Sequence, residues 1–402
     1  MTWLELGPDH PFGLGNLPYG SFADSAGRRH AAVRIGDHAL SLTQATETLA
    51  TEYAAVFADG SLDRFLAAGR PAWTAVRSLA TSWLSDEAYR LAVEALLMPL
   101  GGLELLLPFT VGDYVDFYAS EQHATNVGRI FRPGQEPLTP NWKHLPIGYH
   151  GRSGTVVVSG TDVRRPAGQA RDADGSVVFG PSRRLDLEAE VGFVVGSGST
   201  LGDPVPLAAF ADHVFGVCLV NDWSARDIQA WEYVPLGPFL GKSFATSVSA
   251  WITPLEALTA ARVPGPRRDP APLPYLDDTS DPWGLDIDLD VRLNGELIST
   301  PRFAGMYWTP AQMLAHLTVN GASVRPGDLF ASGTVSGVGL RERGSLLELA
   351  WGGTEPLVLA DGSTRTFLDD GDEVVLSASA PAPDGARIGL GEVRGRITPA
   401  RY

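Results

Sequence analysis

Residues 185–195 read Leu-Asp-Leu-Glu-Ala-Glu-Val-Gly-Phe-Val-Val, with acidic and apolar side chains in alternation over the first half. Because successive side chains of a strand point to opposite faces, Glu188 and Glu190 share one face and the apolar residues share the other. Two neighbouring like charges repel each other unless a cation lies between them. The pattern leaves two interpretations open. The carboxylates lie either on a solvent-facing edge strand or at a site for Ca²⁺ or Mg²⁺, which bind several carboxylate oxygens.

Short apolar runs on both sides of this strand also have the length of strands. They are separated by Gly, Pro and Asp turns and occupy 156–158, 191–195, 214–220 and 373–376. Two helical patterns interrupt them, at 224–232 and at 310–318, and Thr309 is placed to cap the second, with Pro310 in its first turn. We therefore predict a β-rich domain over residues 109–402.

Three aspartates, Asp286, Asp288 and Asp290, resemble the start of a calcium-binding loop. The glycine and glutamate that such a loop needs at its sixth and twelfth positions are missing. Alternation with apolar residues, followed by the turn Asn294-Gly295, predicts instead a hairpin with one solvated face.

The first hundred residues have a different texture. Residues 31–42 predict two short strands around the turn Gly36-Asp37, and helical patterns follow at 43–57, 62–68 and 71–97, with Thr43 or Ser61 as candidate caps. Proline and glycine residues near 100–110 indicate a boundary. The chain is thus expected to be α+β, with a small supporting domain over 1–108 and a larger domain over 109–402.

Composition limits the partners. Of 402 residues, 44% are hydrophobic and 19% charged, which is typical of a globular protein. A net charge of −16 repels nucleic acid and anionic lipid, so neither is expected as a partner, and an anionic substrate needs a local group of cations. The single cysteine, Cys218, lies in an apolar run, so we expect it to be a buried core residue. No targeting segment or membrane span is apparent, so a cytoplasmic protein is expected.

A second polar segment follows the apolar run 214–220. That run leads into Asp222, which is either a functional carboxylate or a helix-start residue. On the helix expected from Ser224, Arg226 and Gln229 are three residues apart and share a face, and Tyr233 lies one turn further along. An acid, a guanidinium, an amide and a phenol together suit an anionic, oxygen-rich ligand, although spacing alone does not establish one.

The loop over 237–246 carries Lys242 and Thr246. It is not a phosphate-binding loop, because only three residues separate Gly237 from Gly241 and Pro238 removes a backbone N–H. We expect instead a loop whose glycines allow its backbone to lie close to neighbouring groups.

Residues 113–126 place Asp116, Tyr118 and His123 in an otherwise apolar entry to the larger domain. A lone histidine is more often structural than catalytic, and both interpretations remain open here. The chain lacks the histidine or cysteine spacing of a zinc site.

Four long stretches together resemble the fumarylacetoacetate hydrolase family: 112–128, 141–152, 221–244 and 325–334. The resemblance implies a small SH3-like N-terminal barrel domain with helices, a larger mixed β-roll catalytic domain, and a homodimer. It also implies hydrolysis of the carbon–carbon bond of 4-fumarylacetoacetate to fumarate and acetoacetate, the last step of tyrosine and phenylalanine catabolism. An acylpyruvate hydrolase with the same metal site, and a non-catalytic calcium-binding protein, remain the alternatives.

The resemblance also implies a role for each matching residue. The catalytic Ca²⁺ or Mg²⁺ is expected at the carboxylates Asp116, Glu188, Glu190 and Asp222, and a second Mg²⁺ or other cation near Asp222, Lys242 and Thr246. His123 is the implied general base, oriented by Glu348. The residues implied to stabilise negative charge are Arg226, Gln229 and Lys242. Those implied to contact the dicarboxylate diketone substrate are Tyr118, Arg132, Tyr149, Gln229, Tyr233 and Thr334.

Overall fold

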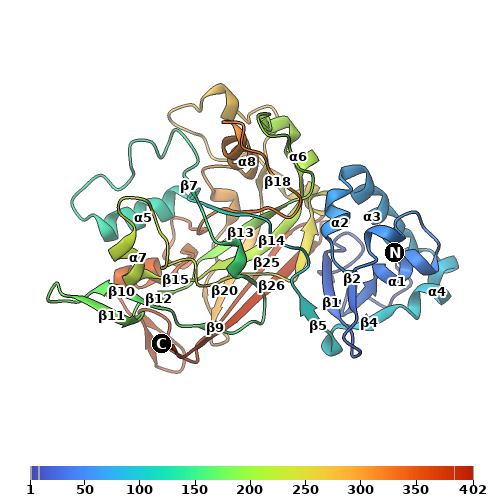
Figure 1. Cartoon of the computed structure of the whole chain (residues 1–402), viewed down its shortest axis with the longest axis horizontal. Coiled ribbons are helices and arrows are strands. Elements are labelled where there is room, and N and C mark those ends of the chain that lie inside the picture. The colour runs from blue at the N-terminus through green and yellow to red at the C-terminus, as the bar shows by residue number, and fades with distance from the viewer. Residues whose placement is uncertain (1, 8–9, 384, 402) are drawn as a thin grey trace.

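A computed structural model describes residues 2–7, 10–383 and 385–401 as an α+β fold with several sheets (Figure 1). The largest sheet has 13 strands, which come from both the N-terminal part of the chain and the part that follows. The N-terminal strands and helices lie together at one end of the molecule, drawn in blue to teal in Figure 1, and the remaining elements lie on the other side.

The described residues of the N-terminal part form five strands and four α-helices. The strands are β1 (Tyr19–Ala23), β2 (Arg29–Ile35), β3 (His38–Ser41), β4 (Leu97–Pro99) and β5 (Glu104–Leu106), and the helices are α1 (Leu42–Thr48), α2 (Asp63–Ala67), α3 (Arg70–Ser85) and α4 (Arg90–Glu94). The predicted hairpin at 31–42 is confirmed, with Gly36 at a φ of 57° between β2 and β3.

Two N-terminal predictions need correction. The helix predicted from Thr43 begins one residue earlier, and its cap is Ser41, whose hydroxyl accepts from the Gln44 N–H. The helical pattern at 71–97 ends in strand β4, which pairs with β3, because pairing at a sheet edge overrides the local helical preference. The strands follow the order β5-β1-β2-β3-β4, and the described strands form no closed barrel, because β4 and β5 are not paired.

Strand pairing in the larger part brings distant segments side by side. Strand β13 (Ala189–Val195) lies between β14 (Val214–Asp222) and β22 (Leu329–Ala331), and β22 runs parallel to β6 (Tyr114–Phe117). The next neighbours are β7 (Gly148–His150), β16 (Thr246–Val248) and β17 (Trp251–Pro254). Every residue of β13 and β14 is buried, which explains their continuous apolar runs, and Cys218 lies among them as predicted.

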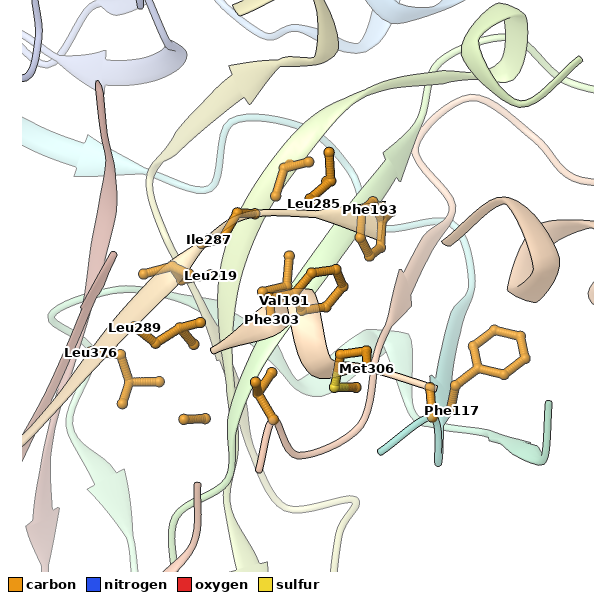
Figure 2. Close-up of a cluster of buried hydrophobic side chains, with 14 of the residues drawn as sticks. Phe117, Val191, Phe193, Leu219, Leu285, Ile287, Leu289, Phe303, Met306 and Leu376 are labelled. Atoms are coloured by element: carbon orange, nitrogen blue, oxygen red, sulfur yellow. The ribbon is translucent and has the colours of Figure 1, made fainter. Parts of the chain in front are cut away.

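A second sheet of five strands packs against the first. Its order is β21 (Glu296–Ser299), β20 (Asp288–Leu293), β25 (Glu373–Pro381), β26 (Arg387–Thr398) and β9 (Val163–Arg164). Figure 2 shows Val191, Phe193 and Leu219 in one cluster with Leu289 and Leu376. The predicted hairpin with one solvated face is confirmed, because the even-numbered aspartates of β20 are half-buried and its leucines and valine are fully buried.

Helix α8 (Pro310–Thr318) begins and ends as predicted, with Thr309 and Gln312 forming a capping box. Helix α7 (Arg226–Glu232) begins two residues later than predicted, because Ser224 and Ala225 form strand β15 (Ser224–Ala225) against β12 (Leu185–Asp186). The remaining α-helices are α5 (Glu121–Phe131), α6 (Phe210–His213) and α9 (Leu346–Leu349). The remaining strands are β8 (Val156–Val158), β10 (Ala167–Arg171), β11 (Val177–Pro181), β18 (Arg262–Val263), β19 (Gly284–Leu285), β23 (Leu357–Val358) and β24 (Thr364–Arg365).

Among the described residues, no helix has the length and apolar character needed to cross a membrane.

Candidate active site

Four carboxylates from three separate segments meet at one end of the large sheet. Asp116 comes from β6, Glu190 from β13 and Asp222 from the end of β14, and Glu188 directly precedes β13. One oxygen from each lies within 4.8 Å of the others, and all four side chains are buried. The interpretation of Glu188 and Glu190 as a solvent-facing pair is therefore wrong, and Asp222 belongs to a strand rather than to the start of a helix.

The cluster has the properties of a site for a divalent cation. The Oδ1 atom of Asp116 and both carboxylate oxygens of Glu190 have no hydrogen-bond partner among the described residues. Buried carboxylate oxygens without a partner are costly, and oxygen-rich clusters of this kind suit Ca²⁺ or Mg²⁺. The donor set therefore fits a hard cation held by carboxylates.

Two cationic side chains lie beside the carboxylates. The Lys242 Nζ donates to Asp222 Oδ2 at 2.7 Å and contacts Glu188 as well. The Arg226 Nη2 donates to Glu188 Oε1 at 2.6 Å, and Arg226 Nη1 donates to the Gln229 side-chain oxygen at 3.1 Å. These cations compensate Glu188 and Asp222, and they leave Asp116 and Glu190 without a cationic partner within 4.0 Å among the described residues.

The pKa shifts follow this uneven compensation. Burial and the neighbouring charge of Asp222 raise the pKa of Asp116 well above its usual value, and burial together with Asp116 does the same to the pKa of Glu190. Burial also raises the pKa of Asp222, although Lys242 opposes the shift. Burial would raise the pKa of Glu188 too, but Arg226 and Lys242 together hold it well below its ordinary value.

A histidine–glutamate pair lies next to the cluster. His123 sits in the first turn of α5, where the hydroxyl of Ser120 caps its backbone N–H. Its Nδ1 lies 2.7 Å from Glu348 Oε2, on the short helix α9, and Nε2 lies 3.9 Å from Glu188 Oε1. Because a carboxylate only accepts hydrogen bonds, Nδ1 carries the hydrogen, and Nε2 is left as the acceptor nitrogen.

Three further side chains hold Glu348 in place. Ser336 and Ser345 donate their hydroxyls to Oε2 at 2.8 and 2.9 Å, and the amide of Asn126 donates to Oε1 at 2.9 Å. Burial opposes the charge on Glu348, but His123 and these hydrogen bonds keep its pKa below the ordinary value. Glu348 is therefore ionised and fixed in orientation.

The predicted site residues converge on one cavity of about 470 Å³. Its walls include most of the predicted set, namely Asp116, Tyr118, His123, Arg132, Tyr149, Glu188, Arg226, Gln229, Tyr233, Lys242 and Thr334. Glu348, Glu190 and Asp222 do not line this cavity, although Glu348 contacts His123, which does. Asp222 and Thr246 line a smaller adjoining cavity of about 130 Å³ together with Tyr149 and Lys242. A hollow of about 850 Å³ beside Arg171 and Trp231 is larger, but its lining includes neither His123 nor the four carboxylates.

Sequence reasoning missed four polar residues at this site: Asn126, Asp186, Ser336 and Ser345. Asn126 lies three residues after His123 and so shares its helix face, which is a signal that could have found it. Asp186 has the same two-residue spacing as Glu188 and Glu190. The two serines carry no comparable signal, because only the tertiary fold brings them to Glu348.

A buried set of carboxylates with unpaired oxygens, beside an oriented histidine in the same cavity, is typical of enzymes that combine a divalent cation with general-base catalysis. The family described as Fumarylacetoacetate (FAA) hydrolase C-terminal matches residues 114–398, and the one described as Fumarylacetoacetase N-terminal matches residues 15–108. The chain belongs to the fumarylacetoacetate hydrolase family, and it is a hydrolase.

Curated relatives match along their whole length. The fumarylacetoacetase of Homo sapiens is 46% identical over 417 residues, covering 100% of this chain and 99% of the relative. The fumarylacetoacetase of Arabidopsis thaliana is 44% identical, covering 99% and 98%. A solved structure, the fumarylacetoacetate hydrolase from Exiguobacterium antarcticum, superposes with a TM-score of 0.56 at 17% identity, covering 96% of this chain and 100% of that one. That structure shows a shared fold.

Proposed function

We propose that this enzyme hydrolyses the carbon–carbon bond of 4-fumarylacetoacetate to give fumarate and acetoacetate, the last step of tyrosine and phenylalanine catabolism. The observation that carries the proposal is that the His123–Glu348 pair adjoins the same cavity as the carboxylate cluster. Relatives that are 44–46% identical over the full chain, and that are named fumarylacetoacetase, support the choice of substrate.

His123 acts as the general base. Glu348 holds the Nδ1 hydrogen, so Nε2 takes a proton from a water molecule in the cavity and Glu348 stabilises the imidazolium that results. The water oxygen bonds to the carbonyl carbon next to the fumaryl group. The bond from that carbon to the methylene between the two ketones then breaks, and its electron pair leaves on the acetoacetate fragment, which takes up a proton.

The carboxylates Asp116, Glu188, Glu190 and Asp222 would hold Ca²⁺ or Mg²⁺. A bound cation supplies Lewis-acid stabilisation for negative charge that develops on the diketone oxygens. Arg226, Gln229 and Lys242 contribute fixed donors on the same side of the cavity, where low solvent access strengthens their effect. These donors act on developing charge rather than on proton transfer.

The substrate carries two carboxylates, and the protein carries a net charge of −16. Arg132, Tyr118, Tyr149, Tyr233 and Thr334 line the cavity and would bind the carboxylates and ketones. The Tyr149 hydroxyl also donates to Asp222 Oδ2 at 3.1 Å. Local cations offset the distant negative field, because charges more than about 8–10 Å away are screened at physiological salt.

A second cation would lie near Asp222 and Thr246, beside the smaller cavity. The ammonium of Lys242 is cationic and already donates to carboxylates, so only the backbone carbonyl of Lys242 would serve as a ligand. The Thr246 hydroxyl, 3.1 Å from Asp222 Oδ1, supplies a further oxygen.

We further infer a cytoplasmic homodimer with domains over 1–108 and 109–402. The order β5-β1-β2-β3-β4, with a short 3₁₀ turn (Leu100–Gly102) between β4 and β5, supports an SH3-like arrangement of the smaller domain. The single buried cysteine is consistent with a reducing compartment.

The proposal is tested by a substrate panel on enzyme of defined metal content. We expect the kcat/KM for fumarylacetoacetate to exceed the values for acylpyruvates and oxaloacetate, because the relatives named fumarylacetoacetase are 44–46% identical over the full chain. A higher kcat/KM for an acylpyruvate would transfer the assignment to a different oxo-acid hydrolase of the same family.

A further inference from the structure

Asp186 is a fully buried carboxylate that has no role in the reaction described above. It ends the short strand β12, two residues before Glu188, and it is not part of the cavity wall. Each of its oxygens accepts more than one hydrogen bond. Both oxygens of Asp186 are therefore held by hydrogen bonds from neighbouring donors. Asp186 itself does not line the cavity and does not contact the unpaired oxygens of Asp116 and Glu190.

One set of donors comes from Arg226. The Nε of Arg226 donates to Asp186 Oδ2 at 2.9 Å, and Nη2 lies 2.8 Å from the same oxygen. Nη2 also reaches Glu188, and Nη1 reaches Gln229. Asp186 thus fixes the inner edge of a planar guanidinium whose outer edge lies at the cavity with Gln229.

A second set of donors comes from helix α9, which carries Glu348. The backbone N–H groups of Leu346 and Leu347 donate to Asp186 Oδ1 and Oδ2 at 2.8 and 3.0 Å. Ser345 caps the next N–H, that of Glu348, and also donates to the Glu348 side chain. A helix of four residues has little stability of its own, so these bonds determine where Glu348 lies.

We propose that Asp186 is a positioning residue that holds the Arg226 guanidinium and the first turn of α9 in one fixed arrangement. It thereby couples the group that stabilises developing charge to the glutamate that orients the catalytic histidine. The expected effect of Asp186 on kcat rests on the proposed function. Its expected effect on the positions of Arg226 and α9 rests on the hydrogen bonds alone.

The role requires a carboxylate of this length. An asparagine retains the volume but presents one NH₂ group, which would face either Arg226 and the Leu347 N–H or the N–H groups of Leu187 and Leu346, all of which are donors. A glutamate retains the charge but moves the carboxylate by one methylene, so it cannot keep both sets of bonds at their present lengths.

The test compares D186N with a matched control, D372N. Asp372 is also buried and accepts from an arginine, Arg365, and from a backbone N–H, that of Asp369, but it does not line the catalytic cavity. In D186N we expect kcat to fall about 10- to 100-fold while KM changes by less than about threefold, because orientation is lost in the transition state and the substrate contacts remain. In D372N we expect reduced thermal stability with kcat retained.

Two further measurements keep the outcome decisive. If D186N does not fold, D186E serves in its place, because it keeps a carboxylate on the buried side chain at position 186, and the same fall in kcat is expected. A crystal structure of the folded variant should show Arg226 or α9 displaced from its present position. An unchanged kcat, a loss no greater than in D372N, or an undisplaced Arg226 and α9 would overturn the inference. If the wild-type enzyme does not hydrolyse fumarylacetoacetate, the proposed function fails. The positioning role of Asp186 is then tested only by whether Arg226 or α9 is displaced in the crystal structure of the variant.

Discussion

At the scale of single residues, the proposed reaction depends on which nitrogen of His123 is free. Glu348 accepts from Nδ1, and Glu348 is itself held by two serines and an asparagine. Nε2 is consequently the acceptor and lies on the side of Glu188 and the cavity. The orientation is fixed before substrate binds, which is the condition for efficient general-base catalysis.

Replacing His123 by alanine should lower kcat by about 10²- to 10⁴-fold, because no other group then accepts the proton from water. Metal content, measured by elemental analysis, should remain that of the wild type, because His123 is not among the carboxylate ligands. His316→Ala is the matched control: His316 is half-buried on α8, and the ring bonds Tyr275 alone among the described residues, so its loss should leave kcat unchanged. Retained turnover in H123A would remove His123 as the base.

At the scale of elements, helix α5 and the loop that follows it determine where Arg132 lies. The Nη2 of Arg132 donates to the backbone carbonyl of Pro137 at 2.8 Å. That carbonyl also packs against Gly128, where a Cβ atom would lie 2.1 Å from the Pro137 oxygen. The helix and the loop fit together only because residue 128 has no side chain.

Gly128→Ala should therefore displace the loop and its bond to Arg132. We expect the KM for fumarylacetoacetate to rise about tenfold, with a smaller change in kcat. A tenfold rise corresponds to the loss of about one charge-assisted hydrogen bond, here the bond between Arg132 and the substrate. Gly154→Ala, at a position where an added methyl group meets no atom within 4 Å, is the control and should leave both constants unchanged. Equal KM values in the two variants would contradict a role for this loop in placing Arg132.

The same scale explains what could be predicted from the sequence. The two-residue spacing of Glu188 and Glu190 predicted a shared face but did not decide between solvent and a metal site, and both side chains lie in the buried cluster. The Thr309 cap of α8 was correct to the residue. Spacing could not show that Asp116 joins them, because β22, more than 200 residues later in the chain, lies between β13 and β6. The helix predicted over 71–97 ran on into Leu97, the first residue of β4, because the strand character of β4 depends on pairing with β3.

At the scale of the whole molecule, the binding of a cation and the binding of protons compete. The raised pKa values of Asp116, Glu190 and Asp222 arise from burial and mutual repulsion in the metal-free protein. A cation binds the deprotonated carboxylates, so it must displace any protons they hold. Because the folded-state pKa values are raised, these groups stabilise the metal-free fold at low pH, and that stability is lost as the pH rises through them.

The competition between protons and the cation can be measured in solution at pH values above about 4, the ordinary pKa of a carboxyl group. The apparent affinity for Ca²⁺ should increase with pH, by about tenfold per unit for each proton displaced. The rise in melting temperature on adding Ca²⁺ should be larger at high pH than at low pH. Calorimetric titrations in buffers of different ionisation enthalpy would detect the released protons, and an affinity independent of pH would contradict this account.

The most direct test of metal-dependent hydrolysis is the rate at which fumarate appears from fumarylacetoacetate when metal-free enzyme is titrated with Ca²⁺ or Mg²⁺. We expect no turnover in the absence of cation and saturable recovery as the cation is added, because the carboxylates cannot compensate the charge that develops on the diketone. Full kcat in enzyme shown by elemental analysis to hold no metal would contradict the account.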